Sequence, residues 1–135
     1  MTKFAAAPAL LLAAALAAAL SACSSAPPDM TVHGTLEVAV QDFSEFQADY
    51  PAATNGSAQV TITDPSGKVV AVTTADGQNV SQSSQSETLT WGWTAKVPEG
   101  LSYYGVSVTG GGGGPVQFTQ AQMKAGPGVC IGDAC

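Results

Sequence analysis

Apolar and polar residues alternate in several short stretches of the chain, a period of two that is typical of β-strands with one buried face. The first stretch, 31–41, carries Val32, Leu36 and Val38 on one face and mostly polar residues on the other. The stretch 88–97 repeats this pattern with larger apolar side chains. The other predicted strands are 60–63, 68–74, 103–109 and 116–118. Six short strands and no long amphipathic helix predict an all-β fold.

Turn-forming residues separate these strands. Asp64-Pro65-Ser66-Gly67 places proline at the second turn position and glycine at the fourth, which predicts a hairpin between the flanking strands. Asp76-Gly77 ends the return strand, and the polar stretch 78–86 is predicted to be a loop. Pro98-Glu99-Gly100 makes the next turn, and the glycine run 110–114 predicts a flexible connection. This order indicates a small antiparallel β-sandwich or barrel of immunoglobulin-like or transthyretin-like size.

The predicted β domain spans 31–123. Near its end, Thr119 and Gln122 fit a capping box, which predicts a single helical turn. The polar stretch 42–57 predicts a long loop. Residues 124–135 are expected to form a C-terminal tail that contains a small disulfide loop.

The start of the chain has the order of an export signal. Lys3 precedes an uncharged run from Phe4 to Leu20, which is shorter than the roughly 20 apolar residues that a spanning helix needs. Leu20-Ser21-Ala22-Cys23 follows and resembles the lipobox of bacterial lipoproteins. The resemblance implies that residues 1–22 are a helical signal peptide, cleaved before a cysteine that carries diacylglyceryl and acyl chains such as palmitate. An ordinary signal peptide with an incidental cysteine, or a retained transmembrane anchor, is the alternative.

An acylated Cys23 implies a protein of the cell membrane that faces outside the cytoplasm, with 23–30 as the acylated cysteine and its tether. The mature chain of 113 residues has three lysines, no arginine and ten acidic residues, so its formal net charge is −7. This balance argues against nucleic-acid binding, which requires a basic surface. It also argues against electrostatic docking on anionic lipid, so the acyl chains must supply the membrane affinity.

Two cysteines, Cys130 and Cys135, remain once Cys23 is acylated. An oxidising compartment and the short spacing predict that they form a disulfide, which loop entropy makes worth roughly 2 kcal/mol. A metal or redox role needs more ligands than the neighbouring Asp133 supplies. We therefore expect no metal and no cofactor.

Four strand-and-turn segments, 34–36, 60–69, 104–108 and 116–123, resemble those of a loose group of small exported actinobacterial proteins, lipoproteins among them. They cover most of the predicted domain. The resemblance implies an exported β domain and implies no activity. Relatives of this type often carry charged or bulky residues where this chain has its glycine run, which puts any binding edge at that place in doubt.

The ionisable side chains give two candidate sites. His33, the only histidine, lies on the polar face of the first strand without a nucleophile motif, so we interpret it as a solvated strand residue. Asp42, Glu45 and Asp49 form an acidic cluster and a weak calcium candidate, because calcium takes oxygen ligands. Their spacing differs from that of an EF-hand loop, so we favour a solvated loop.

The aromatic residues Trp91, Trp93, Tyr103 and Tyr104 are weak candidates for binding a sugar ring or a peptide. Both tryptophans share one face of their strand with other apolar residues. That arrangement is typical of a core strand, and a small sandwich needs such bulk to fill its interior. We therefore favour core filling.

These observations favour a non-enzymatic, membrane-anchored envelope lipoprotein whose β domain serves binding or structure, with an envelope protein or glycan as partner. The alternative is a carbohydrate-active or other hydrolytic enzyme that uses the Asp42–Asp49 loop. Such an enzyme requires a concave pocket with convergent polar groups. A third interpretation, a subunit of a larger envelope complex, predicts an exposed hydrophobic sheet edge.

Replacing the lipobox cysteine tests the anchor directly. We expect Cys23→Ala to abolish incorporation of a clickable fatty acid, because the acyl chains are attached through that thiol. The measurement is metabolic labelling followed by in-gel fluorescence. Equal labelling of the variant and the wild type would contradict the lipoprotein interpretation.

Overall fold

The computed structural model describes residues 25–40, 44, 47–48, 51, 57–82, 87–111, 113–132 and 135. The predicted signal peptide 1–22, Cys23, and the acidic cluster of Asp42, Glu45 and Asp49 lie outside these residues. Within the described part of the chain, no helix is long and apolar enough to cross a membrane.

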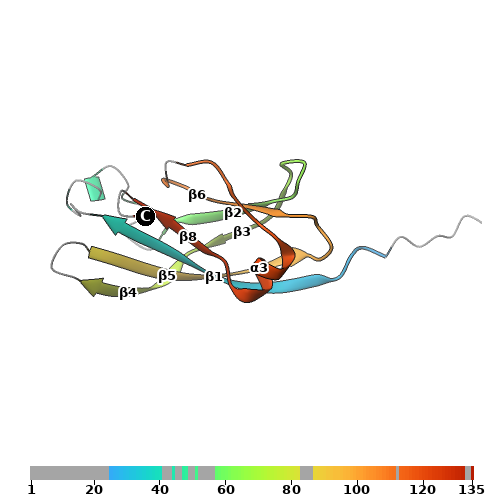
Figure 1. Ribbon diagram of the computed structural model, residues 1–135, viewed down its shortest axis with the longest axis horizontal. Helices are drawn as coiled ribbons and strands as arrows, with labels where there is room; N and C mark the ends of the chain where they lie inside the picture. Colours follow the sequence, from blue (N-terminus) through green and yellow to red (C-terminus); the bar gives the residue numbers. More distant parts are fainter. Residues whose placement is uncertain are drawn as a thin grey trace, which may run out of the picture.

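Two four-stranded sheets pack face to face, which confirms the predicted small all-β sandwich (Figure 1). All strand pairs are antiparallel except β1 with β8, which are parallel. A short helix, α3 (Gln120–Ala125), connects β7 to β8. Sheet A has the order β4 (Asp76–Gln82), β5 (Glu87–Pro98), β1 (Asp29–Val40), β8 (Gly128–Ile131). Sheet B has the order β3 (Val69–Thr74), β2 (Gln59–Thr63), β6 (Tyr104–Val108), β7 (Val116–Phe118).

The core lies between the sheets and is built on the pairing of β1 with β5. Leu36 is the register partner of Trp91, and Val38 is the partner of Leu89, so the apolar faces of the two strands coincide. All four side chains are buried. From sheet B, alternate residues of β2 and β6 complete the interior, which confirms that period two in the sequence marks the buried faces.

Gly34 is required by the packing of Trp93. The two residues are register partners, and a Cβ on Gly34 would overlap the indole ring of Trp93. Glycine therefore gives the ring the space to lie against the backbone of β1. Burial of ring surface, more than hydrogen bonding, holds the tryptophans here, since the buried indole N–H groups of Trp91 and Trp93 have no acceptor among the described residues.

The predicted hairpin between β2 and β3 is present. The Gly67 N–H donates to the Asp64 carbonyl at 2.9 Å, and Gly67 has a φ of 85°, which glycine adopts without strain. The Asp64 carboxylate accepts from the Ser66 hydroxyl, the Ser66 N–H and the Lys68 N–H. These hydrogen bonds, that of the Ser66 hydroxyl foremost, lower the pKa of Asp64 below its ordinary value.

Tyr104 fixes the crossing from sheet A to sheet B. Its hydroxyl donates to the Pro98 carbonyl at 2.7 Å, and its ring is fully buried. Burial raises the pKa of Tyr104 above its ordinary value. A tyrosine at the start of this strand that bonds back to the upstream backbone is the tyrosine corner of immunoglobulin-type sandwiches.

The strand order also corresponds to that of an immunoglobulin-type sandwich. Strands β1 to β7 occupy the positions of B, C, C′, D, E, F and G in that order. The position of strand A, beside B, is taken by β8, which comes from the C-terminus and runs parallel to β1. Such a fold supports many unrelated functions, so the strand order by itself assigns none.

The structure corrects three sequence-based boundaries. The predicted loop 78–86 contains most of β4, because an edge strand can pair through its backbone without an apolar pattern. The predicted tail 124–135 contains β8, whose four residues are too few for a clear period-two signal. Strand β1 begins at Asp29, inside the predicted tether 23–30, and the Glu99 N–H donates to the Pro28 carbonyl there. The predicted strand 116–118 and the capped helical turn after it are confirmed.

Removal of one hydroxyl tests the tyrosine corner. We expect Tyr104→Phe to lower the free energy of unfolding by about 1–2 kcal/mol, because the Pro98 carbonyl loses its donor. The matched control is Tyr103→Phe, since the Tyr103 hydroxyl makes an exposed 3.3 Å bond to the Pro65 carbonyl. We expect the control to change the free energy by less than about 0.5 kcal/mol. Urea denaturation measures both, and equal effects would contradict a special role for Tyr104.

Candidate functional site

The structure places most of the aromatic candidates in the core. The exposed fractions of Trp91, Trp93 and Tyr104 are 1%, 2% and 0%, so these residues fill the interior and offer no stacking surface. Tyr103 is partly exposed, but its hydroxyl contacts the β2–β3 turn at Pro65. The four residues therefore do not form a joint binding strip.

The ionisable candidates do not converge on a site. His33 is exposed on the outer face of sheet A, and its Nδ1 lies 3.1 Å from the Thr94 hydroxyl on β5. Among the residues that the structure describes, no three His, Cys, Asp or Glu side chains are grouped to hold a metal ion. The acidic cluster of Asp42, Glu45 and Asp49 falls outside them, so it remains a sequence-based candidate.

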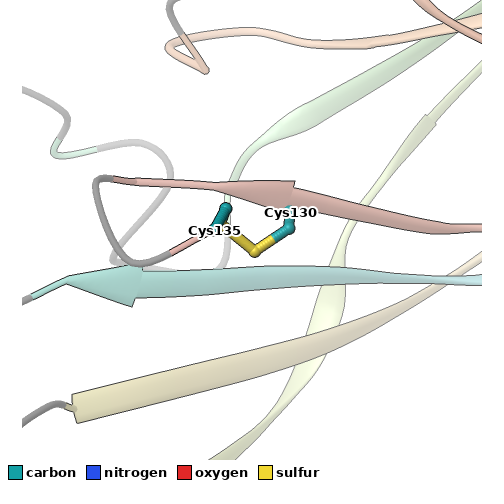
Figure 2. The surroundings of a disulfide bond; sticks show 2 residues. All are labelled: Cys130 and Cys135. Atoms are coloured by element: carbon teal, nitrogen blue, oxygen red, sulfur yellow. A yellow bond between two sulfur atoms is a disulfide. The ribbon is translucent and has the colours of Figure 1, made fainter.

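Cys130 and Cys135 form a disulfide, with Cα atoms 5.9 Å apart. Cys130 is exposed on β8, whereas its neighbours Val129 and Ile131 are buried. The bond therefore lies outside the core and draws the last residue back alongside β8 (Figure 2). The predicted disulfide loop thus sits on a strand of the sandwich.

A groove of about 250 Å³ opens between the two sheets at the edge formed by β7 and β8. One wall comes from β8 and the other from β6, the start of β7 and the glycine run. Its described lining residues are Val106, Ser107, Val108, Gly111, Gly113, Gly114, Val116, Val129, Cys130, Ile131 and Gly132. The sequence does not indicate most of them as site residues. They belong to β8, whose four residues give no clear period-two pattern, or to the glycine run, which predicts only a flexible connection.

The groove forms where the helix no longer covers the edge. Met123 of α3 is fully buried and fills the space between the sheets near the start of β1. Further along the same edge, glycines of the run 110–114 line the groove and have no side chain to fill it. A Cβ on Gly111 would lie 3.0 Å from Ile131 Cγ2 and 3.2 Å from the Val108 carbonyl oxygen, so glycine lets the run approach β8 closely. Beside it, Gly113 and Gly114 border open space.

The surface of the groove is about half polar and half apolar. Its described walls carry valine and isoleucine side chains, glycine backbone, Ser107 and Cys130, and no carboxylate, imidazole or amine. The Ser107 hydroxyl donates to the Thr61 carbonyl at 3.5 Å. General acid–base or nucleophilic catalysis needs paired polar groups that converge on one point.

The groove also lies at a defined end of the molecule. We call the end where β1 begins, at Asp29 and its partner Pro98, the tether end. The opposite end, where Val38 pairs with Ile131, is the far end, and the groove is there. The stretch from Asp29 to Val38 spans about 30 Å at roughly 3.3 Å per residue. Figure 1 shows the start of β1 and the end of β8 at opposite ends of the sandwich.

Loss of the disulfide should loosen the groove wall. We expect Cys130→Ser with Cys135→Ser to lower the free energy of unfolding by about 2 kcal/mol, the value for so short a loop. Hydrogen exchange should quicken more in β8 than in β2 and β3, because the disulfide is attached to β8. A reducing agent should reproduce the effect in the wild type and leave the variant unchanged. An equal gain in exchange in both regions would contradict this local role.

Comparisons with protein-family models, with curated proteins and with solved structures found no match to the chain.

Proposed function

We propose that the protein is a lipid-anchored envelope protein, held on the outer side of the membrane through Cys23, whose β domain binds a partner in the groove without catalysing a reaction. The observation that carries the proposal is the position of the groove. It lies at the far end of the sandwich, opposite the end at which the chain enters from the tether. A domain anchored through that tether presents the groove away from the bilayer.

The charge distribution supports this orientation. Lys68 lies in the β2–β3 turn, Lys96 is the register partner of Thr31, and Lys124 forms a 3.1 Å ion pair with Glu99. All three lysines of the mature chain are therefore at the tether end, where they offset acidic groups. The far end carries Glu37 and Glu87 and has no lysine among the described residues. On an anionic membrane, repulsion favours the orientation with the acidic far end outward.

The interpretation as a subunit of a larger complex has one observation in its favour. Val69 and Val72 on the edge strand β3 are 52% and 53% exposed, and no strand of sheet B carries a charged residue. Exposed apolar edges of this kind attract other strands. The hydrolase alternative depends on Asp42, Glu45 and Asp49, which lie outside the described residues, and no described residue favours it.

Photo-crosslinking in living cells tests the proposed function. We expect p-benzoylphenylalanine at position 116, on the groove, to form a specific adduct in the membrane fraction. Val116 and Val72 are both exposed valines on edge strands, so position 72 is the matched control. Adding Gly114→Val to the position-116 protein should abolish the adduct, because the new side chain stands in the lining of the groove without meeting an atom of the fold.

The outcomes separate the interpretations. An adduct at position 116 that Gly114→Val removes supports a binding groove. Adducts at position 72 alone would favour the interpretation as a subunit of a larger complex and would contradict the proposal that the groove binds a partner. Absence of any adduct at position 116 would also overturn it.

A further inference from the structure

We infer that the groove takes an extended segment of a second polypeptide, which adds a strand to the free edge of β8 and inserts one apolar side chain, with basic residues on either side. The inference rests on the proposed function and names its ligand class. Three observations carry it: the unpaired edge of β8, the size and chemistry of the groove, and the distribution of charge.

The unpaired main-chain groups of β8 favour a polypeptide ligand. Among the described strands, β8 pairs only with β1, so its other edge presents main-chain donors and acceptors. A lipid or another purely apolar molecule seated there would bury these groups without partners, at a cost of about 1–3 kcal/mol for each group. An extended peptide supplies matching N–H and carbonyl groups, as in other cases of strand addition.

The size of the groove fits one side chain. A cavity of roughly 150 Å³ is enough to hold a benzene-sized molecule, whereas pockets for drug-sized ligands run from about 300 to 1,000 Å³. The groove, at about 250 Å³, falls between these values. The surface of the groove is about half polar and half apolar, and its apolar side chains are those of Val106, Val108, Val116, Val129 and Ile131. This mixture suits the main chain of an extended peptide that carries one apolar side chain. A peptide strand with a leucine at its centre fits both the volume of the groove and the chemistry of its surface.

The charges favour basic residues beside that side chain. The lining is uncharged, but Glu37, the register partner of Cys130, is exposed at this end on the outer face of sheet A. In a strand added to β8, the residues next to the inserted side chain would lie on that same outer face. The lysines that could neutralise it lie at the tether end. A segment with lysine or arginine on either side of its apolar residue therefore gains attraction, and an acidic segment is repelled.

The test uses the mature lipidated protein in nanodiscs and three labelled peptides. The probe is Lys-Val-Thr-Leu-Thr-Val-Lys with blocked ends. One comparison peptide has aspartate in place of leucine, and the other has glutamate in place of both lysines. Fluorescence anisotropy measures affinity, and hydrogen exchange locates the bound segment. We expect the probe to bind and to protect β8, and each comparison peptide to bind at least about tenfold more weakly.

Two variants locate the site. We expect Gly114→Val to weaken the probe at least about tenfold, because residue 114 lines the groove and a Cβ there meets no atom of the fold, so the fold tolerates the added side chain. Val72→Thr, on the opposite edge, should change the affinity by less than about twofold. No binding, protection of β3 in place of β8, equal binding of the glutamate peptide, or indifference to Gly114→Val would each overturn the inference.

Failure here is distinguishable from failure of the proposed function. If position 116 crosslinks in cells to a glycan or a lipid, the binding groove stands and the polypeptide ligand is wrong. If position 116 gives no adduct, both are wrong.

Discussion

The pairing of β1 with β5 is the constraint on which the rest of the sandwich depends. These are the two longest strands, and their register runs unbroken from Asp29 with Pro98 to Val40 with Glu87. Because side chains alternate between faces, a slip by one residue would turn the tryptophans of β5 outward and remove the largest side chains from the core. Gly34 opposite Trp93 makes that register specific, since only this alignment gives the indole ring its space. The remaining strands pack on the surface that this pair creates.

Much of the fold could be predicted from local patterns, since its central strands alternate cleanly over five or more residues and end at recognisable turns. The β2–β3 hairpin and the capped turn at Thr119 are set by residues within a few positions of each other. Strands β4 and β8 could not be predicted in the same way. The polar sequence of β4 carries no period-two pattern, and β8 pairs with a strand from the other end of the chain. Long-range pairing of that kind leaves no local signal.

The candidate site was predicted less well than the fold, for a related reason. The conspicuous residues of the sequence, such as Trp91 and Trp93, stand out because they are large, and large apolar side chains belong to the core. The groove is lined mainly by glycines and short aliphatic side chains, which do not stand out in the sequence as binding residues. Gly111 matters because it lets the chain approach Ile131, and only the packed sheets reveal that contact. The disulfide was the one feature of this region that spacing predicted, because its two cysteines are close in sequence.

The parallel pairing of β8 with β1 has a consequence for the timing of folding. Sheet A is complete only when a strand close to the C-terminus reaches the first strand of the domain. A contact between such distant segments carries a large loop-closure cost and forms slowly. For a chain proposed to be threaded across a membrane from its N-terminus, the ladder between β1 and β8 cannot close until Ile131 has emerged. Under that proposal, sheet A is completed only on the outer side of the membrane.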